Sequence, residues 1–516
     1  MRQKHLFPKS LRWWLIVLTV ALHACGDQDR GAFSDQSAAS AQSASQPAAA
    51  DRPLIDEREY SNRGDAALPD ASEAAAVTHR QIELDGRTLR YTATTGHLTA
   101  AVDSGKRASM FYVAYTVDDR ARSKRPVTFL FNGGPVTASV WLHLGSWGPK
   151  RIAAEARGTN ALHPTLIDSD DSLLDQSDLV FVDAVGTGYS QAIAPSVNRD
   201  FWGVDQDAAA FHGFILRYIE VNRREASPIY LYGESYGGIR AAVLANLLAT
   251  SGATLGGVVL NSPILNFNTA CDLGAPDCTG FIPSYAAVST HHRVSNKPDA
   301  MPAADYARQA GRFAVDIYRP ALLDYLRRGA APSAALLADL AGYTGIAPAE
   351  WARHLNMTPD LYVTRVRPGY VIDINDGRNS APAGSDWQDP YRDALEAGIH
   401  ALLPEFLGYR ARSAYSMVAG DAWTWEHDGL PLPDAIPDLA SALAQSPGTQ
   451  VVALNGYHDL NCPFLQTELE LERVGYAHRV RSHTFAGGHM TYLTEASRQP
   501  MRQVLRDLYR QAGDRS

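Results

Sequence analysis

The stretch Ile229-Tyr230-Leu231-Tyr232-Gly233-Glu234-Ser235-Tyr236-Gly237-Gly238-Ile239-Arg240 decides the fold. Its apolar start, residues 229–232, is short and ends at a glycine, which predicts a buried strand. A helix-like segment, residues 239–248, follows directly. Glycines on both sides of Ser235 allow a sharp turn that exposes the serine oxygen at the sheet edge. Strand, G-x-S-x-G and helix in this order predict a nucleophile elbow, and the alternative is an ordinary glycine-rich turn.

Short apolar runs of the same kind lie on both sides of this unit. Asp85-Gly86 joins two segments of alternating hydrophobicity, which predicts a hairpin. The predicted strands are residues 81–84, 88–91, 110–115, 127–131, 179–182, 258–260, 451–454 and 479–485. Helix-like segments such as 205–219 lie between several of them. This alternation predicts an α/β fold with a mostly parallel central sheet, and the serine turn makes the α/β-hydrolase fold the expected member of that class.

The strand pattern is interrupted between residues 267 and 440. Alanine-rich helical segments lie there among loops rich in proline and glycine, at 303–314, 332–341 and 348–354. The chain therefore divides into a first core part (76–266), a helical insertion or cap (267–440) and a second core part (441–516). We expect the insertion to cover the carboxyl edge of the sheet, where ligands bind in such folds.

Composition and charge exclude several classes of protein. Lys and Arg total 47 against 56 Asp and Glu, which gives a net charge of −9 and argues against nucleic-acid binding. Hydrophobic residues make up 45% of the chain, enough for a large core and too many for a wholly disordered protein. Four cysteines are too few for a disulfide-based scaffold. A fibrous or polytopic membrane protein is a poor fit as well.

The first 75 residues have the features of an export segment. Residues 1–24 carry positive charges and then a short apolar run, 13–22, too short for a membrane span of about 20 residues, so a signal peptide is predicted. Leu22-His23-Ala24-Cys25 resembles a bacterial lipobox with Cys25 as the lipidated residue. His23 is unusual there, and cleavage without lipidation is the alternative. Residues 25–75 are rich in Ala, Ser, Gln and Asp, which predicts a disordered tether.

Export determines the expected surroundings of the protein and the state of its cysteines. The predicted location is the periplasm, the outer membrane as a lipoprotein, or the medium, with membrane contact through a lipid anchor at most. Because such compartments are oxidising, Cys271 and Cys278 are predicted to form a disulfide, and two free thiols are the alternative. Cys462 has no evident partner.

A nucleophilic serine needs a base and an orienting acid. In α/β-hydrolases these follow the serine in the order acid, then histidine. Asp459 ends Asn455-Gly456-Tyr457-His458-Asp459, a loop that follows the predicted strand near residue 451. His489 lies in a glycine-bearing loop after the strand 479–485. These positions predict the triad Ser235, Asp459 and His489, with His458 as the rival base.

The oxyanion formed by serine attack needs backbone N–H donors. The amide of Tyr236, directly after the nucleophile, is one candidate. The second is expected in Asn132-Gly133-Gly134-Pro135, which follows the strand near residue 128. Paired glycines allow the backbone to approach a ligand closely, and a plain turn is the alternative.

These motifs together resemble the serine carboxypeptidases (peptidase S10). The resemblance covers roughly residues 80–510 and is closest to the bacterial branch, through Trp141-Leu142-His143-Leu144-Gly145 and Arg240. The five ordered motifs that carry it are NGGP (132–135), DAVGTGYS (183–190), GESYGG (233–238), NGYHD (455–459) and GGHM (487–490).

The resemblance implies removal of C-terminal residues from peptides through an acyl-enzyme. Ser235 would attack the last peptide carbonyl, with His489 as base and then acid, while Asp459 orients the histidine. Amides of Gly134 and Tyr236 would hold the oxyanion. The substrate-binding residues it implies are Asn132, Gly133 and Glu234, of which the asparagine and the glutamate would hydrogen-bond the free carboxylate of the substrate. Glu234 must be protonated to donate, which favours acidic pH.

The sequence departs from the family pattern at three positions. Val136 replaces a usual glycine, Ser146 stands where eukaryotic members have a second glutamate, and Ala184 follows Asp183 where the family has proline. An esterase or acyltransferase with the same triad is therefore the first alternative. A non-catalytic binding protein on a hydrolase scaffold is the second. Arg240 is either a carboxylate-binding residue or, more commonly for a helix arginine, a structural one.

The expected partner is a peptide with a free C-terminus, and no nucleic acid. No cofactor is expected. No metal site is predicted either, because His291-His292 and His458 lie in no recognised metal-binding motif. Five tryptophans are candidates for a pocket lining or for the core: Trp141, Trp147, Trp202, Trp423 and Trp425.

Overall fold

The computed structural model describes residues 50–102, 104–118, 120–121, 124–153, 165–271, 273, 275–385, 391–420 and 422–513. The predicted signal peptide, the lipidation site Cys25 and the tether up to residue 49 lie outside these residues. Within the described part, no helix is both long and apolar enough to cross a membrane.

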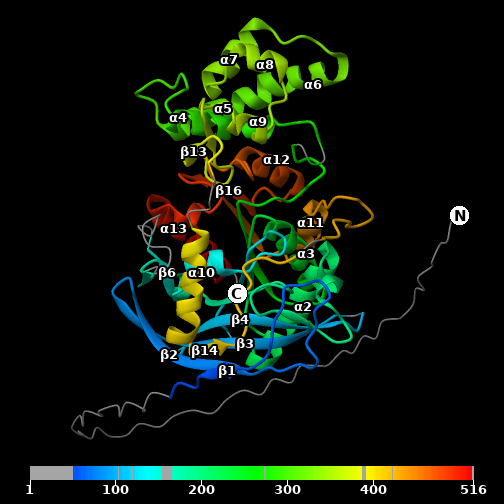
Figure 1. The fold of residues 1–516 in the computed structure, drawn as a ribbon, viewed down its shortest axis with the longest axis vertical. Helices are drawn as coiled ribbons and strands as arrows, with labels where there is room; N and C mark the ends of the chain where they lie inside the picture. The colour runs from blue at the N-terminus through cyan, green and yellow to red at the C-terminus, as the bar shows by residue number, and fades with distance from the viewer. Residues whose placement is uncertain are drawn as a thin grey trace, which may run out of the picture. The chain divides into compact units, whose positions relative to one another are not determined.

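A ten-stranded sheet forms the centre of the molecule (Figure 1). Its strand order is β16-β15-β11-β10-β5-β8-β4-β3-β2, with β9 beside β4. Neighbouring strands from β16 to β8 run parallel, whereas β8, β4, β3 and β2 pair antiparallel. The strands are β2 (Ala75–Leu84), β3 (Arg87–Ala101), β4 (Arg107–Val117), β5 (Val127–Phe131), β8 (Asp178–Val182), β9 (Gln191–Ile193), β10 (Ile229–Glu234), β11 (Leu255–Asn261), β15 (Gln450–Gly456) and β16 (Val480–Phe485). The predicted α/β-hydrolase fold is confirmed.

The chain reverses its direction of strand addition between β5 and β10. After β5 the next sheet strand, β8, joins one side of it, and β10 then joins the other side. Loops that leave the carboxyl ends of two such strands diverge and open a crevice, which is where open α/β sheets bind ligands. The segments after β5 and β10 are the predicted oxyanion loop and the serine turn.

Helices cover both faces of the sheet because its central strands are buried on both sides; every residue of β5, β8, β10 and β11 is buried. One face carries α2 (Val204–Asn222), α3 (Gly237–Thr250) and α11 (Ile436–Gln445), whose apolar residues share a core with the strands. The opposite face carries α1 (Val140–Gly145), α10 (Arg392–Ala401) and α13 (Glu495–Gly513).

Six helices between β11 and β15 form a separate layer, here called the helical unit. They are α4 (Ile282–His291), α5 (Ala303–Phe313), α6 (Arg319–Arg328), α7 (Ala334–Thr344), α8 (Pro348–Arg353) and α9 (Pro359–Val363). Their core includes Tyr285, Leu340 and Trp351, and it continues into α12 (Phe464–Val474). Figure 1 shows the helical unit at one end of the molecule, above α12 and the parallel part of the sheet.

Short elements complete the chain. The strands are β1 (Leu54–Asp56), β6 (Lys150–Ile152), β7 (Leu166–Asp168), β12 (Tyr370–Ile372), β13 (Ser380–Pro382) and β14 (Tyr409–Ala411). The single helical turns are η3 (Leu173–Asp175), η4 (Asn198–Phe201), η5 (Thr279–Phe281), η6 (Ala314–Tyr318), η7 (Leu402–Phe406) and η8 (Thr491–Leu493).

The folded body begins earlier than the composition of the chain predicts. Residues 50–75, expected to belong to the tether, pack against the core instead. Strand β1 pairs with β14, the Tyr60 ring stacks on the His97 ring at 5.2 Å, and Leu68 is 3% exposed. Leu54, Tyr60 and Leu68 contact residues far away in sequence, so local composition does not reveal their positions.

Candidate active site

Ser235 lies in the turn between β10 and α3, with a left-handed backbone at φ 61°. Residues with a side chain rarely adopt this conformation, and where they do the strain is often functional. The turn is so tight that a Cβ on residue 233 would lie 2.0 Å from the Gly237 carbonyl oxygen. The Ser235 N–H donates to the Asn261 carbonyl at 3.0 Å, which secures the turn on β11. The predicted elbow is therefore the geometry that these glycines produce.

The predicted base and acid meet after β15 and β16. His489 Nδ1 lies 2.9 Å from Asp459 Oδ2. The other carboxylate oxygen of Asp459 accepts the N–H groups of Asn461 and Cys462, each at 2.8 Å. Although burial opposes a charged ring, the Asp459 carboxylate raises the pKa of His489 well above its ordinary value. The pair can hold a proton on the imidazole during a reaction.

The backbone of His489 is fixed from two directions. Its N–H donates to the Asn375 carbonyl at 2.6 Å, and its carbonyl accepts the Ser262 hydroxyl at 2.7 Å. Asn375 belongs to the segment between β12 and β13, which follows the helical unit. A residue outside the sheet core thus helps to position the base.

Cys462 is a buried thiol beside the triad that sequence reasoning left without a role. It interacts with both His489 and Ser235, and burial raises its pKa. Among the described residues no hydrogen bond links His489 directly to Ser235, a bond that can be long or misaligned before substrate binds. The position of Cys462, three residues after Asp459, is the signal that could have identified it.

His458, the rival base, is not joined to Asp459. Its ring is buried, and its Nδ1 has no hydrogen-bond partner among the described residues. Burial lowers the pKa of His458 to about 4. His489 is the histidine that the fold pairs with the acid.

The two predicted oxyanion donors lie on adjacent backbone segments. A Cβ on Gly133 would lie 2.6 Å from the Tyr236 nitrogen, so the loop after β5 packs directly on the serine turn. Gly134 has φ 104°, a conformation that strongly favours glycine. Gly134, Ser235 and Tyr236 all border one cavity. Val136 is not among the residues with positive φ, so its side chain causes no such strain.

Arg240 supports the oxyanion loop from inside the protein. Its guanidinium group is buried, forms an ion pair with Asp207 at 2.5 Å, and donates to the carbonyls of Asn132 and Pro135. All of these partners are groups of the protein itself. Arg240 is therefore a structural residue and not a carboxylate-binding one.

Asn132 and Glu234 form a buried polar pair behind the nucleophile. Asn132 Nδ2 donates to Glu234 Oε1 at 2.7 Å, and Asn132 Oδ1 accepts the Leu142 N–H at 3.0 Å. Burial raises the pKa of Glu234 to about 7. Ser146 makes no contact of this kind, because its hydroxyl donates to the Leu142 carbonyl at 2.5 Å. No carboxyl group at position 146 therefore pairs with Glu234.

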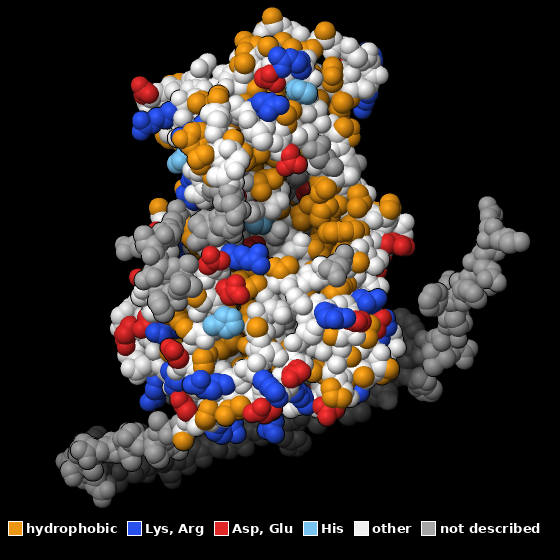
Figure 2. Space-filling view, in the orientation of Figure 1, with side chains coloured by type: hydrophobic (Ala, Val, Ile, Leu, Met, Phe, Trp, Pro, Cys, Tyr) orange, Lys and Arg blue, Asp and Glu red, His pale blue; other side chains and the backbone are white. Residues whose placement is uncertain are grey.

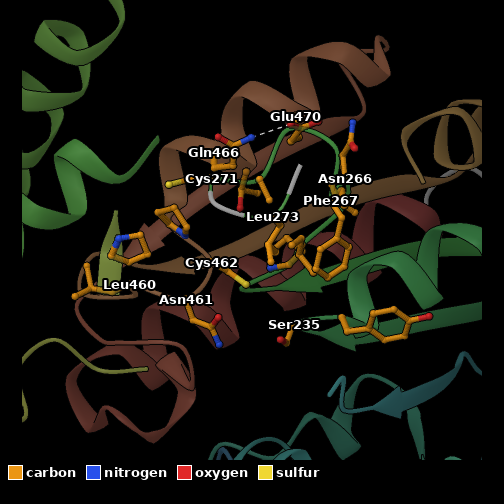
Figure 3. A pocket seen from close by; sticks show the side chains of 18 of the residues that line it. Ser235, Asn266, Phe267, Cys271, Leu273, Leu460, Asn461, Cys462, Gln466 and Glu470 are labelled. Atoms are coloured by element: carbon orange, nitrogen blue, oxygen red, sulfur yellow. Dashed lines mark hydrogen bonds between the residues drawn. The ribbon is translucent and has the colours of Figure 1, made fainter. Parts of the chain in front are cut away.

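A cavity of about 340 Å³ opens beside Ser235. Its walls are mostly apolar, and they include Leu265, Phe267, Leu273, Ile374, Trp425 and Leu460. Figure 3 shows Ser235 at one end of the cavity and Gln466 and Glu470 of α12 at the other. Hydrophobic side chains also gather on the outer surface beside α11, below the helical unit (Figure 2). The site can therefore receive a large apolar group next to the nucleophile.

The structure joins Cys271 and Cys278 in a disulfide. Cys271 borders the cavity, and so does Leu273 from the loop that the disulfide closes. The disulfide loop is therefore part of the cavity wall.

One group of side chains outside this site has the composition of a metal site. His427, Asp428 and Asp438 offer ligand atoms within 4.8 Å of one another. Both ring nitrogens of His427 are already bonded, to Asp205 at 2.6 Å and to Asp438 at 2.9 Å. These two carboxylates raise the pKa of His427 to about 10, so the group is an ion-pair network around a buried histidine.

Comparisons with known proteins give one family match and several distant structural similarities. Residues 85–279 match the serine carboxypeptidase family model, whereas no curated protein matches the chain. Solved structures with a similar course of the chain include a proline iminopeptidase of Mycobacterium smegmatis (15% identity, 82% of this chain and 100% of that chain, TM-score 0.34). An esterase from Thermogutta terrifontis has 13% identity over 80% of this chain and 99% of that chain, with a TM-score of 0.33. A bacterial heroin esterase has 12% identity over 81% and 84%, with a TM-score of 0.32.

The matched region contains the nucleophile turn and the loop after β5, while Asp459 and His489 lie beyond it. Family and fold together support a serine hydrolase. The resemblance predicted from the motifs is matched over residues 85–279 by the model of the serine carboxypeptidase family.

Proposed function

We propose that this protein is a serine carboxypeptidase that releases the C-terminal residue of peptides through an acyl-enzyme. The observation that carries the proposal is the buried Asn132–Glu234 pair directly beside the nucleophile. A protonated Glu234 and the Asn132 amide are both hydrogen-bond donors, which suits a substrate carboxylate. The raised pKa of Glu234, about 7, keeps it protonated in acid.

The triad supplies the covalent steps. Ser235 Oγ attacks the carbonyl carbon of the last peptide bond, and its proton passes to His489 Nε2. Amides of Gly134 and Tyr236 stabilise the oxyanion. The C–N bond then breaks, and His489 returns the proton to the leaving amine. Water hydrolyses the acyl-enzyme by the same proton transfers in reverse.

The cavity beside Ser235 receives the residue on the acyl side of the scissile bond. Asn132 and Glu234 do not border this cavity, so a terminal carboxylate bound by these two residues lies outside the cavity. The apolar walls favour a large apolar side chain at that position. The disulfide supports action outside the cytoplasm, as the predicted signal peptide implies.

The test compares a blocked dipeptide that has a free C-terminus with its C-terminal amide, between about pH 4.5 and about pH 7.5. We expect hydrolysis of the acid and little of the amide, with the acid favoured at low pH. Equal hydrolysis of both peptides would contradict carboxylate recognition.

An esterase or acyltransferase is the second candidate, because Ser146 leaves Glu234 without a carboxyl partner and the cavity suits an apolar acyl group. Turnover of simple esters without cleavage of either peptide would favour it. In either case a fluorophosphonate should label Ser235, whereas a non-catalytic binding protein would remain unlabelled.

A further inference from the structure

We propose that Tyr492 is a third hydrogen-bond donor for the terminal carboxylate of the substrate, beside Asn132 and Glu234. The inference rests on the proposed carboxypeptidase function. The family has a second glutamate at the position of Ser146 in its eukaryotic members. We infer that the phenol of Tyr492, from a different part of the chain, takes over its hydrogen-bonding role. Tyr492 lies in η8, three residues after His489.

The hydroxyl of Tyr492 is buried without a partner. The side chain is 0% exposed, and within the described residues its hydroxyl makes no hydrogen bond of good geometry. The hydroxyl interacts with Glu234 and, less strongly, with Tyr232 and Asn132. A buried hydroxyl that donates to nothing costs free energy, and a ligand that brings an acceptor removes this cost. A carboxylate has acceptor oxygens only, so it is the complementary ligand.

The protein holds this ring rigidly at the end of α1. Arg498 donates to the carbonyls of Tyr492 at 2.6 Å, Gly145 at 2.7 Å and Ser146 at 2.7 Å, and it also pairs with Asp171. The ring lies so close to α1 that a Cβ on Gly145 would be 2.7 Å from its Cε2 atom. One guanidinium group therefore holds the backbone of Tyr492 at the end of α1, beside Ser146.

A phenol differs chemically from a second glutamate in one important way. Burial, together with the nearby Glu234, raises the pKa of Tyr492 well above its ordinary value, so the hydroxyl keeps its proton. It donates whether or not Glu234 is ionised. Ser146 cannot take this role, because its hydroxyl already donates its hydrogen bond to the Leu142 carbonyl.

The experiment compares wild type with Tyr492→Phe, which removes only the hydroxyl. For each protein, kcat/KM is measured on the blocked dipeptide acid and on an ester of the same acyl group that lacks a free carboxylate. We expect kcat/KM for the acid to fall about tenfold or more, mainly through KM, while the ester is hydrolysed at the wild-type rate. The thermal midpoint should change little, since only a hydroxyl without a well-aligned hydrogen bond is removed.

Tyr230→Phe is the matched control. Tyr230 is also fully buried with an unpartnered hydroxyl, but it packs on Tyr509 at 4.5 Å, near the start of β10. It should leave both substrates unaffected. Binding of the acid and of its amide to Ser235→Ala, with and without Tyr492→Phe, repeats the comparison independently of turnover.

The outcomes separate the two proposals. Suppose first that wild type prefers the acid, so that the carboxypeptidase function stands. The role of Tyr492 is then wrong if Tyr492→Phe keeps this preference, slows hydrolysis of both substrates equally, or does not fold. If wild type neither binds nor cleaves the acid in preference to the amide, the proposed function is wrong and the inference fails with it.

Discussion

Ser235 has its oxygen beside the cavity and its backbone in a conformation that glycine would adopt more easily. A strained backbone beside a cavity is typical of a residue whose side-chain oxygen must hold one position for catalysis. We expect Ser235→Ala to reduce hydrolysis at least about 10³-fold while the fold is retained, because alanine fits the same turn. Peptide hydrolysis and circular dichroism measure the two effects. Ser284→Ala, which also removes a buried hydroxyl, is the control. An active Ser235→Ala protein would show that the site is elsewhere.

Glu234 combines a buried position with a titration near neutrality. Its pKa of about 7 means that it loses its proton, and with it one donor for the substrate, as pH rises through neutrality. Glu234→Gln keeps a neutral donor at every pH. We therefore expect the fall in kcat/KM for free-acid peptides between about pH 6 and about pH 8 to disappear in this variant. A pH profile identical to that of wild type would mean that another group titrates.

The same titration affects stability. Since the folded-state pKa lies above that of an exposed glutamate, the stabilising effect of the protonated group is complete in acid and is lost as pH rises through about 7. Urea unfolding of wild type and of Glu234→Gln should thus diverge as pH rises from about 4.5 to about 7, and the variant gains stability relative to wild type over this range. Parallel stability curves across this range would contradict the raised pKa.

At the scale of elements, Arg240 links α3 to the loop that follows β5. Removal of its charge leaves Asp207 buried without a partner, which costs about 3–5 kcal/mol for such pairs. We expect Arg240→Gln to be destabilised by this order in urea unfolding, and to lower kcat more than it raises KM. Arg63→Gln, which breaks an exposed ion pair with Asp65, should change neither quantity. An Arg240→Gln protein with wild-type kcat would show that the loop keeps its position unaided.

The disulfide loop borders the cavity, so it should control which acyl-side residue fits. In the variant Cys271→Ser/Cys278→Ser we expect fluorophosphonate labelling of Ser235 to persist, because the triad lies on other elements. The preference among peptides that differ in acyl-side residue should become broader. Kinetics on a series from alanine to phenylalanine measures this preference. An unchanged preference would mean that the loop holds its place without the bond.

Local patterns predicted the elements of the sheet well, because buried parallel strands are continuous apolar runs. The strand predicted at 127–131 has these bounds in β5, whereas 258–260 is too short for β11, since Gly256 and Gly257 break the apolar run. The pairing of β1 with β14 could not be predicted, because it joins segments more than 350 residues apart.

Local patterns also predicted the residues that meet at the candidate site, because these residues follow the ends of predicted strands. Ser235, Asp459 and His489 occupy loops at strand ends, so their meeting follows from the order of the strands. The contacts of Arg240, Cys462 and Tyr492 with this site depend on which side chains face one another in the folded protein. A helix arginine or a buried tyrosine has no local pattern that reveals such a role.

At the scale of the whole molecule, the start of α9 and loops at the carboxyl ends of the sheet strands enclose the cavity together with α12. Apolar walls come from the segment after β11, from the region around Ile374 and from the loop before α12. Substrate preference is therefore distributed over segments far apart in sequence. A single substitution in one wall should alter preference by degrees and not reverse it.

The hydrogen bond from the His489 N–H to the Asn375 carbonyl has a consequence for protein engineering. Neighbouring bonds join Leu460 to Ile374 and Gly377 to His458, so residues 374–377 are attached to both catalytic loops. An exchange of helices between relatives, made to transplant specificity, must leave this short stretch in the recipient. A graft that ends after α9 would keep the native anchor, while one that extends to β13 would import a foreign support for the base.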